Sequence, residues 1–175
     1  MPTAIRSAVA NDAKPIATLH ATVWRETYQN LAPPEILAKL DLAHRLNTWE
    51  MHLNTPSPQH HILLASWGET IVGFTFFGPA TNPVFGTHPE VKHLYVDSKC
   101  QGAGIGKQLL HAAFQQLLAD GFSTAALATA KGNTPALAFY QAMGGKQVGQ
   151  FIDAGPIWKS ENLIIAWDNL QTSPL

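Results

Sequence analysis

The apolar residues of this chain follow two spacings, one typical of strands and the other typical of helices. Strands are indicated where apolar residues alternate with polar ones or form short runs between turn residues. These segments are residues 4–9, 61–67, 70–78, 91–96, 123–129, 146–152 and 163–167. Apolar residues three or four positions apart predict helices over residues 12–30, 35–53 and 105–120, and a short helix that Asn133 caps. The second helix is expected to break near Asp41.

Turn-forming residues separate these elements. Gly68 lies between two strands as in a hairpin, and Pro33-Pro34 ends the first helix. Residues 79–89 form a loop rich in Gly, Pro and Asn. The resulting order is strand, two helices, three strands, helix, strand, helix and two strands. It predicts a single mixed α/β domain over residues 1–175, without repeats, linkers or low-complexity segments.

Composition excludes several classes of function. The formal net charge is -1, with 11 Lys and Arg against 12 Asp and Glu, which argues against nucleic acid as a partner. No apolar run could span a bilayer, and no basic amphipathic stretch suggests a membrane surface. The one cysteine, Cys100, forms no intrachain disulfide, and the histidines lack the spacing of a metal site. Because no signal-peptide pattern opens the chain, we expect a cytoplasmic protein. The histidine spacing gives the expectation that it holds no metal.

The most informative segment is Gln-Gly-Ala-Gly-Ile-Gly-Lys at residues 101–107, between a predicted strand and a predicted helix. Glycines permit positive φ angles and let a ligand approach the main chain closely. The first N–H groups of a helix have no internal partner, and the helix dipole favours an anion there. The segment is therefore expected to bind a phosphate group.

Three phosphate-binding motifs compete for this segment. A P-loop needs Ser or Thr after Lys107, where Gln108 stands. A Rossmann fingerprint needs Gly-x-Gly-x-x-Gly inside an early βαβ unit, and no such unit precedes the segment. The acetyl-CoA motif Arg/Gln-x-x-Gly-x-Gly/Ala matches at Gln101, Gly104 and Gly106. A helix start without any ligand remains the alternative.

With this turn the chain resembles the GNAT superfamily of acetyl-CoA-dependent N-acetyltransferases. A second run, Asn133-x-x-Ala136-x-x-Phe139-Tyr140-x-x-x-Gly144, looks like the second CoA-binding segment of that family. The family usually continues with Gly-Phe, and here a second glycine replaces the Phe. The resemblance covers nearly the whole chain. It implies an α+β fold with a mixed, mostly antiparallel sheet, helices on both faces and splayed central strands.

The resemblance implies a role for each segment. Main-chain amides of the glycine turn would hold the pyrophosphate of acetyl-CoA, and the preceding strand would bind its pantetheine arm. Asn133 would bond the pantetheine region, and Tyr140 would protonate the departing thiolate. The residues expected to contact acetyl-CoA are Leu94, Tyr95, Val96, Gln101, Gly102, Ala103, Gly104, Ile105, Gly106, Lys107, Asn133, Ala136, Phe139 and Tyr140.

An attacking amine must first lose a proton, so the reaction also needs a base. Glu90 stands six residues before Val96, where some family members carry a catalytic glutamate. His93 is the second candidate, because imidazole titrates near neutral pH. On a regular strand these two side chains point to opposite faces, and a bulge would change that. A base acting through water is the third possibility.

The acceptor pocket is expected between the first two helices and the loop at residues 79–89. Trp24 and Tyr28 share a helix face, and with Phe85 of the loop they are the candidate substrate-binding residues. Trp49 is expected to belong to the core. Arg25 and Arg45 could hold an acceptor carboxylate, but both are expected to be solvated.

The predicted function is transfer of an acetyl group from acetyl-CoA to a primary amine of a small molecule or peptide, in a ternary complex. An acyl-enzyme route through Cys100 is less favoured, because no histidine adjoins it in sequence. A non-catalytic acetyl-CoA sensor and a nucleotide-binding protein of another family remain alternatives. Members of the family often dimerise, so a homodimer is compatible with the resemblance.

Overall fold

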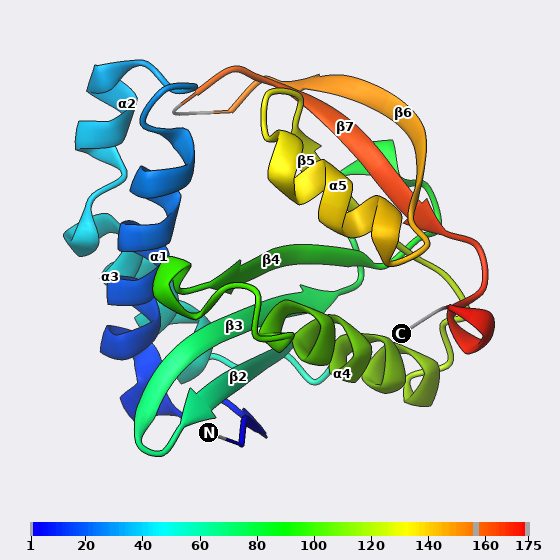
Figure 1. Ribbon diagram of the computed structural model, residues 1–175, viewed down its shortest axis with the longest axis horizontal. Helices are drawn as coiled ribbons and strands as arrows, with labels where there is room; N and C mark the ends of the chain where they lie inside the picture. The colour runs from blue at the N-terminus through cyan, green and yellow to red at the C-terminus, as the bar shows by residue number, and fades with distance from the viewer. Residues whose placement is uncertain (1, 156–157, 174–175) are drawn as a thin grey trace.

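The computed structural model describes residues 2–155 and 158–173 (Figure 1). Its strands are β1 (Ala4–Ser7), β2 (His61–Trp67), β3 (Thr70–Gly78), β4 (Glu90–Val96), β5 (Ala125–Ala130), β6 (Lys146–Asp153) and β7 (Ser160–Trp167). Its α-helices are α1 (Ala13–Tyr28), α2 (Pro34–Lys39), α3 (Leu42–Asn54), α4 (Ile105–Ala119) and α5 (Thr134–Ala142). Short 3-10 turns are η1 (Ala10–Asp12), η2 (Pro83–Phe85), η3 (Ser98–Cys100) and η4 (Leu170–Thr172).

Each predicted strand and helix is present, with boundaries shifted by only a few residues. The break expected near Asp41 is confirmed, since α2 ends at Lys39 and α3 begins at Leu42. The Asp41 side chain accepts a hydrogen bond from the His44 amide at 2.9 Å, which caps the new helix. Capping explains why the chain starts a second helix there instead of continuing the first.

The strands form one sheet in the order β1-β2-β3-β4-β5-β7-β6, and helices cover both of its faces. Helices α1 and α3 pack on one face through residues such as Ile16, Trp49 and Phe74. Helices α4 and α5 pack on the other face, where Phe114 and Tyr140 share one apolar cluster. In Figure 1, α1 to α3 gather at the left, while α5 lies above β4 beside β5 and β7.

Among the strands of the described residues, only β4 and β5 pair in parallel, and they do so through a single register pair, Glu90 opposite Ala126. The Ala126 amide donates to the Pro89 carbonyl at 2.9 Å, and beyond this point the two strands separate. Residues 94–96 of β4 are consequently half-exposed although the strand is central in the sheet. The mixed, mostly antiparallel sheet with splayed central strands is thereby confirmed.

A bulge in β4 sets the direction of its side chains. Phe76 of β3 lies opposite His93, whereas Phe77 lies opposite Val91, so Lys92 is an extra residue. Val91 consequently packs on the α4 face, while His93 packs against Phe76 on the α1 and α3 face. Because Glu90 alternates with Val91, Glu90 and His93 share one face, unlike the regular strand considered above.

Candidate active site

The glycine turn has the backbone geometry that its sequence indicates. Gly102 and Gly104 have φ angles of 81° and 78°, in the left-handed region that favours glycine. A Cβ on Gly102 would meet no atom within 4 Å, and one on Gly104 would meet only Gln108 Nε2 at 4.0 Å. The chain around these two glycines is open to solvent, so their conformation, and not crowding, requires glycine.

The turn presents a group of free donors. The first helical bond runs from the Gln108 amide to the Gly104 carbonyl at 3.0 Å. In the described part of the chain, the main-chain N–H groups of residues 102–107 donate to no acceptor. Gln101 uses its side chain to donate to the Val96 carbonyl at 3.3 Å, which fixes the turn to the end of β4. Such a cluster at a helix N-terminus suits an anion.

Gly106 differs from the two glycines before it. It has an ordinary helical conformation, but a Cβ there would lie 3.3 Å from Cζ of Phe139. The absence of a side chain therefore lets α5 approach α4 closely. This contact connects the two segments of the acetyl-CoA motif through the Phe139 ring, next to Tyr140 in α5.

The α5 segment begins with Asn133, whose side-chain oxygen accepts a hydrogen bond from the Ala136 amide at 3.3 Å. Tyr140 is 9% exposed and packs edge-on against Trp167, with ring centroids 6.2 Å apart. Burial raises the pKa of the Tyr140 hydroxyl above its ordinary value, and the nearby Tyr28 raises it to a lesser extent. The hydroxyl is therefore protonated at neutral pH and can serve as a proton donor.

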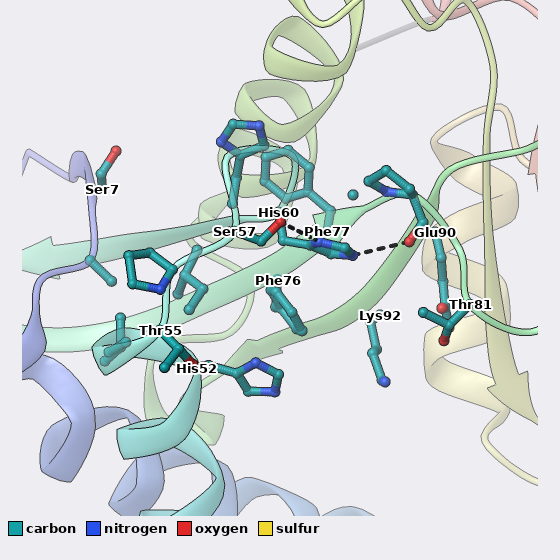
Figure 2. Close-up of a pocket in the computed structure, with 17 residues that line it drawn as sticks. Ser7, His52, Thr55, Ser57, His60, Phe76, Phe77, Thr81, Glu90 and Lys92 are labelled. Atoms are coloured by element: carbon teal, nitrogen blue, oxygen red, sulfur yellow. Dashed lines mark hydrogen bonds between the residues drawn. The ribbon is translucent and has the colours of Figure 1, made fainter.

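Glu90 lies at the point where β4 and β5 meet, on the edge of a cavity of about 340 Å³. Figure 2 shows Glu90 and Lys92 on one side of this cavity and His52 on another. Burial raises the pKa of Glu90, Lys92 lowers it, and Asp153 raises it further. A raised pKa makes the carboxylate a stronger proton acceptor, and the cavity gives it a route to water.

His93 is a weaker candidate for the base. Its ring lies 4.9 Å from His20 and 5.6 Å from Trp49, measured between ring centroids. Burial, with the charges of Lys92 and Arg45, lowers the pKa of His93 to about 3. An imidazole with that pKa stays neutral at physiological pH and accepts a proton poorly, which favours Glu90.

Beyond Glu90, β4 separates from β5, and we call this region the opening. An aromatic cluster that includes Trp24 and Tyr28 of α1 and Tyr95 of β4 lies beside it. The ring centroids of Trp24 and Tyr28 are 4.8 Å apart, and Trp158 packs edge-on against both at 6.2 and 5.8 Å. Tyr95 of β4 packs against the same group. The expectation that Trp24 and Tyr28 share a face is met, and Trp158 joins them from the segment between β6 and β7.

Arg45 lies beside this cluster, contrary to the expectation of a solvated side chain. Its Cζ atom is 5.4 Å from the centroid of the Trp24 ring, and its Nε atom is buried without a hydrogen-bond partner. Arg25, in contrast, is exposed as expected. Arg45 lies on α3 and Trp24 on α1, and the two side chains meet because these helices pack against each other.

Other candidates lie away from the opening. Phe85 is buried in a separate cluster with Ala126 and Ile164, so the structure does not bring it together with Trp24 and Tyr28. Trp49 is a core residue, 1% exposed, as expected. Cys100 packs with Ile105 and other apolar residues beneath the glycine turn.

The described residues contain neither a cluster of metal-ligating side chains nor a helix that could span a membrane. Within residues 2–155 and 158–173, no three His, Cys, Asp or Glu side chains gather as a metal ion would require. Among the helices that the structure describes, none combines the length and hydropathy needed to cross a membrane.

Comparisons with known proteins agree with this geometry. The model of the acetyltransferase (GNAT) family matches residues 14–145. The N-acetyltransferase YuaI of Bacillus subtilis (strain 168) is 28% identical over 146 residues, which span 83% of this chain and 82% of that protein. PaiA N-acetyltransferase from Thermoplasma acidophilum, solved with coenzyme A, superposes with a TM-score of 0.73 at 20% identity, covering 95% of this chain and 98% of that one. The structure of yncA, a putative acetyltransferase from Salmonella typhimurium with its cofactor acetyl-CoA, superposes with a TM-score of 0.70 at 17% sequence identity. The match covers 97% of this chain and 95% of that one.

The splayed sheet and the matched family model define the class of protein. The chain belongs to the acetyltransferase (GNAT) family. It is therefore an acyltransferase, with acetyl-CoA as the acetyl donor and an amine as the acceptor.

The sequence-based prediction of the acceptor site missed Trp158, and it considered Arg45 but expected a solvated side chain. The sequence shows Arg45 as a charged residue, but it does not indicate that the side chain is half-buried, because Trp24 contacts it from another helix. Trp158 lies in a segment without periodicity, more than a hundred residues after Trp24 along the chain. Neither position carries a local pattern that would connect it to the site.

Proposed function

We propose that the protein acetylates a primary amine of a small molecule or peptide by direct attack on acetyl-CoA within a ternary complex. The observation that carries this proposal is the opening between β4 and β5. Free amides lie at the start of α4, Tyr140 belongs to an apolar cluster against which Leu94 of β4 packs, and Glu90 lies where the two strands meet. An acetyl donor and an amine could enter such an opening from its two faces.

The α4 side suits the donor. Amides of residues 102–107 would bind the pyrophosphate, because they have no partner in the described chain. The pantetheine arm would bond the main chain of residues 94–96. On the side toward β5, these residues pair with no strand, because the β4–β5 pairing ends at Glu90. Asn133, Ala136 and Phe139 would line the same arm at the start of α5.

The chemistry follows from two side chains with opposite tasks. Glu90, directly or through water, would take a proton from the ammonium form of the acceptor. The free amine then attacks the thioester carbon, a C–N bond forms, and a main-chain N–H of β4 stabilises the oxyanion. When the C–S bond breaks, the protonated hydroxyl of Tyr140 gives its proton to the thiolate. Proximity of the two bound substrates supplies much of the rate.

A panel of primary amines tests this proposal through the release of free CoA thiol. In double-reciprocal plots of initial rates against both substrates, the lines should intersect, as a ternary complex requires. Parallel lines would indicate an acyl-enzyme through a residue such as Cys100. Calorimetry with acetyl-CoA and with ATP completes the test. Binding of acetyl-CoA without turnover of any amine would reject the enzyme in favour of a sensor.

A further inference from the structure

The aromatic cluster on the acceptor side contains one cation whose charge has no protein counterpart. No ion pair in the described chain includes Arg45. The charged or ionisable groups that act on it most strongly are Tyr95 and Tyr28, which are neutral at physiological pH. A half-buried guanidinium without an anion is costly, because burial penalises its charge and no described carboxylate neutralises it.

The surroundings of Arg45 explain its placement but not its charge. Trp24 provides a flat ring under the guanidinium, a contact that stabilises a cation without neutralising it. The buried Nε donor remains without an acceptor, although a guanidinium has donors in a fixed planar fork. A methionine or leucine would fill the same space without that penalty. The unpaired donors are therefore matched to something outside the chain.

Arg45 also lies close to two residues of β4, His93 and Tyr95. Its charge lowers the pKa of His93 on β4 after burial and Lys92, and it opposes the raised pKa of Tyr95. Tyr95 in turn is close enough to Tyr140 for the two hydroxyls to influence each other. Tyr95, which packs against the aromatic cluster, is thus a neighbour of Arg45.

We propose that Arg45 binds an anionic group of the acceptor, so that the substrate is a primary amine that also carries a carboxylate. A planar carboxylate matches the guanidinium fork with two parallel hydrogen bonds. One guanidinium neutralises one carboxylate, which leaves the complex without excess charge. The rings of Trp24, Tyr28 and Trp158 then hold the apolar part of the same molecule.

One member of the cluster, Trp158, borders a cavity. This cavity has a volume of about 450 Å³, and Leu31, Gly132 and Lys159 also line it. The two basic residues of that cavity are Lys131 and Lys159, and Lys131 pairs with Glu161 at 3.4 Å. The single acidic residue among the described residues that line this cavity, Glu161, is paired, so the surface beside Trp158 does not repel a carboxylate.

This inference rests on the proposed function and is tested with matched acceptors. Each pair consists of an amino acid and its carboxamide, for instance methionine and methioninamide, measured by CoA release. The carboxylate form should have a kcat/KM roughly 10- to 100-fold higher, the range expected for hydrogen bonds to a charged group. Equal rates, or faster reaction of the carboxamides, would overturn the role of Arg45 while leaving amine acetylation intact.

Three variants separate recognition of the anion from simple packing. Arg45→Met should raise KM for the carboxylate acceptor and remove the preference over the carboxamide, with little change in kcat for the carboxamide. Arg45→Lys should restore only part of the preference, because an ammonium lacks the planar fork. Arg25→Met, on an exposed arginine, is the matched control and should keep the wild-type preference.

Failure of the variants has a distinct meaning from failure of the reaction. If Arg45→Met lowers rates for both acceptor forms equally, Arg45 only supports the fold and the inference is wrong. If Arg45→Met unfolds, Arg45→Lys and the wild-type acceptor pairs still decide the question. If no amine in either form releases CoA, the proposed function fails and the inference fails with it.

Discussion

Replacing Gly104 by alanine separates the backbone requirement of the glycine turn from its role in binding acetyl-CoA. Gly104 has a φ angle of 78° at the start of α4, and Gly121 has one of 92° just after its end. A Cβ would meet no atom closer than 4.0 Å at Gly104 and none within 4 Å at Gly121. The two substitutions therefore impose a similar backbone penalty at opposite ends of one helix.

The expected loss of stability is small and similar for both variants. A left-handed conformation costs a non-glycine residue about 1–2 kcal/mol. For a domain of this size, 1 kcal/mol lowers Tm by roughly 2–4 °C. Gly104→Ala and Gly121→Ala should therefore both remain folded at 25 °C, with a decrease in Tm of roughly 2–8 °C.

Binding should distinguish them. Gly104 belongs to the segment with free amides at residues 102–107, where the pyrophosphate is proposed to bind, so a strained alanine there should displace at least one of these donors. Loss of one hydrogen bond to a charged group costs about 1.5–3 kcal/mol, or roughly a 10- to 100-fold higher Kd for acetyl-CoA. Gly121→Ala should bind as the wild type does. Calorimetry at one temperature measures both, and equal Kd values for the two variants would refute the reasoning.

The remaining predictions concern the two proton-transfer residues. Tyr140→Phe should lower kcat roughly 100-fold, as expected for loss of a general acid, with acetyl-CoA affinity within about twofold of wild type; unchanged kcat in stopped assays would remove Tyr140 from the mechanism. Tyr95→Phe, which deletes a neighbouring hydroxyl, is its control and should have the smaller effect. Glu90→Gln should lower kcat/KM and abolish the acidic limb of the pH profile. Because burial raises the pKa of Glu90, wild-type activity should fall as pH drops through a value above that of an exposed glutamate; a limb that persists in Glu90→Gln would assign it to another group. His93→Asn should leave that limb in place.

The local features of this protein follow from its sequence, because they depend on neighbouring residues. The turn at residues 101–107 has its conformation from its own glycines and from the helix that begins beside it. The break at Asp41 follows from capping, which is also local. Strand and helix periodicity likewise predicts which elements pack on the sheet.

Features that depend on pairing between distant segments could not be predicted in the same way. The bulge at Lys92 exists only in the register between β3 and β4, and it places Glu90 and His93 on one face. Phe85 looked like a pocket residue because of its loop, yet it packs against β5 and β7. Arg45 is half-buried only because Trp24 covers it from α1.

The central claim is that main-chain amides at the start of α4 hold the pyrophosphate of acetyl-CoA. The most direct measurement is a crystal structure with CoA, in which distances are taken from the pyrophosphate oxygens to the amide nitrogens of residues 102–107. We expect several of these distances to be about 2.7–3.2 Å, with the pantetheine arm beside β4. A pyrophosphate bound elsewhere on the protein would contradict it.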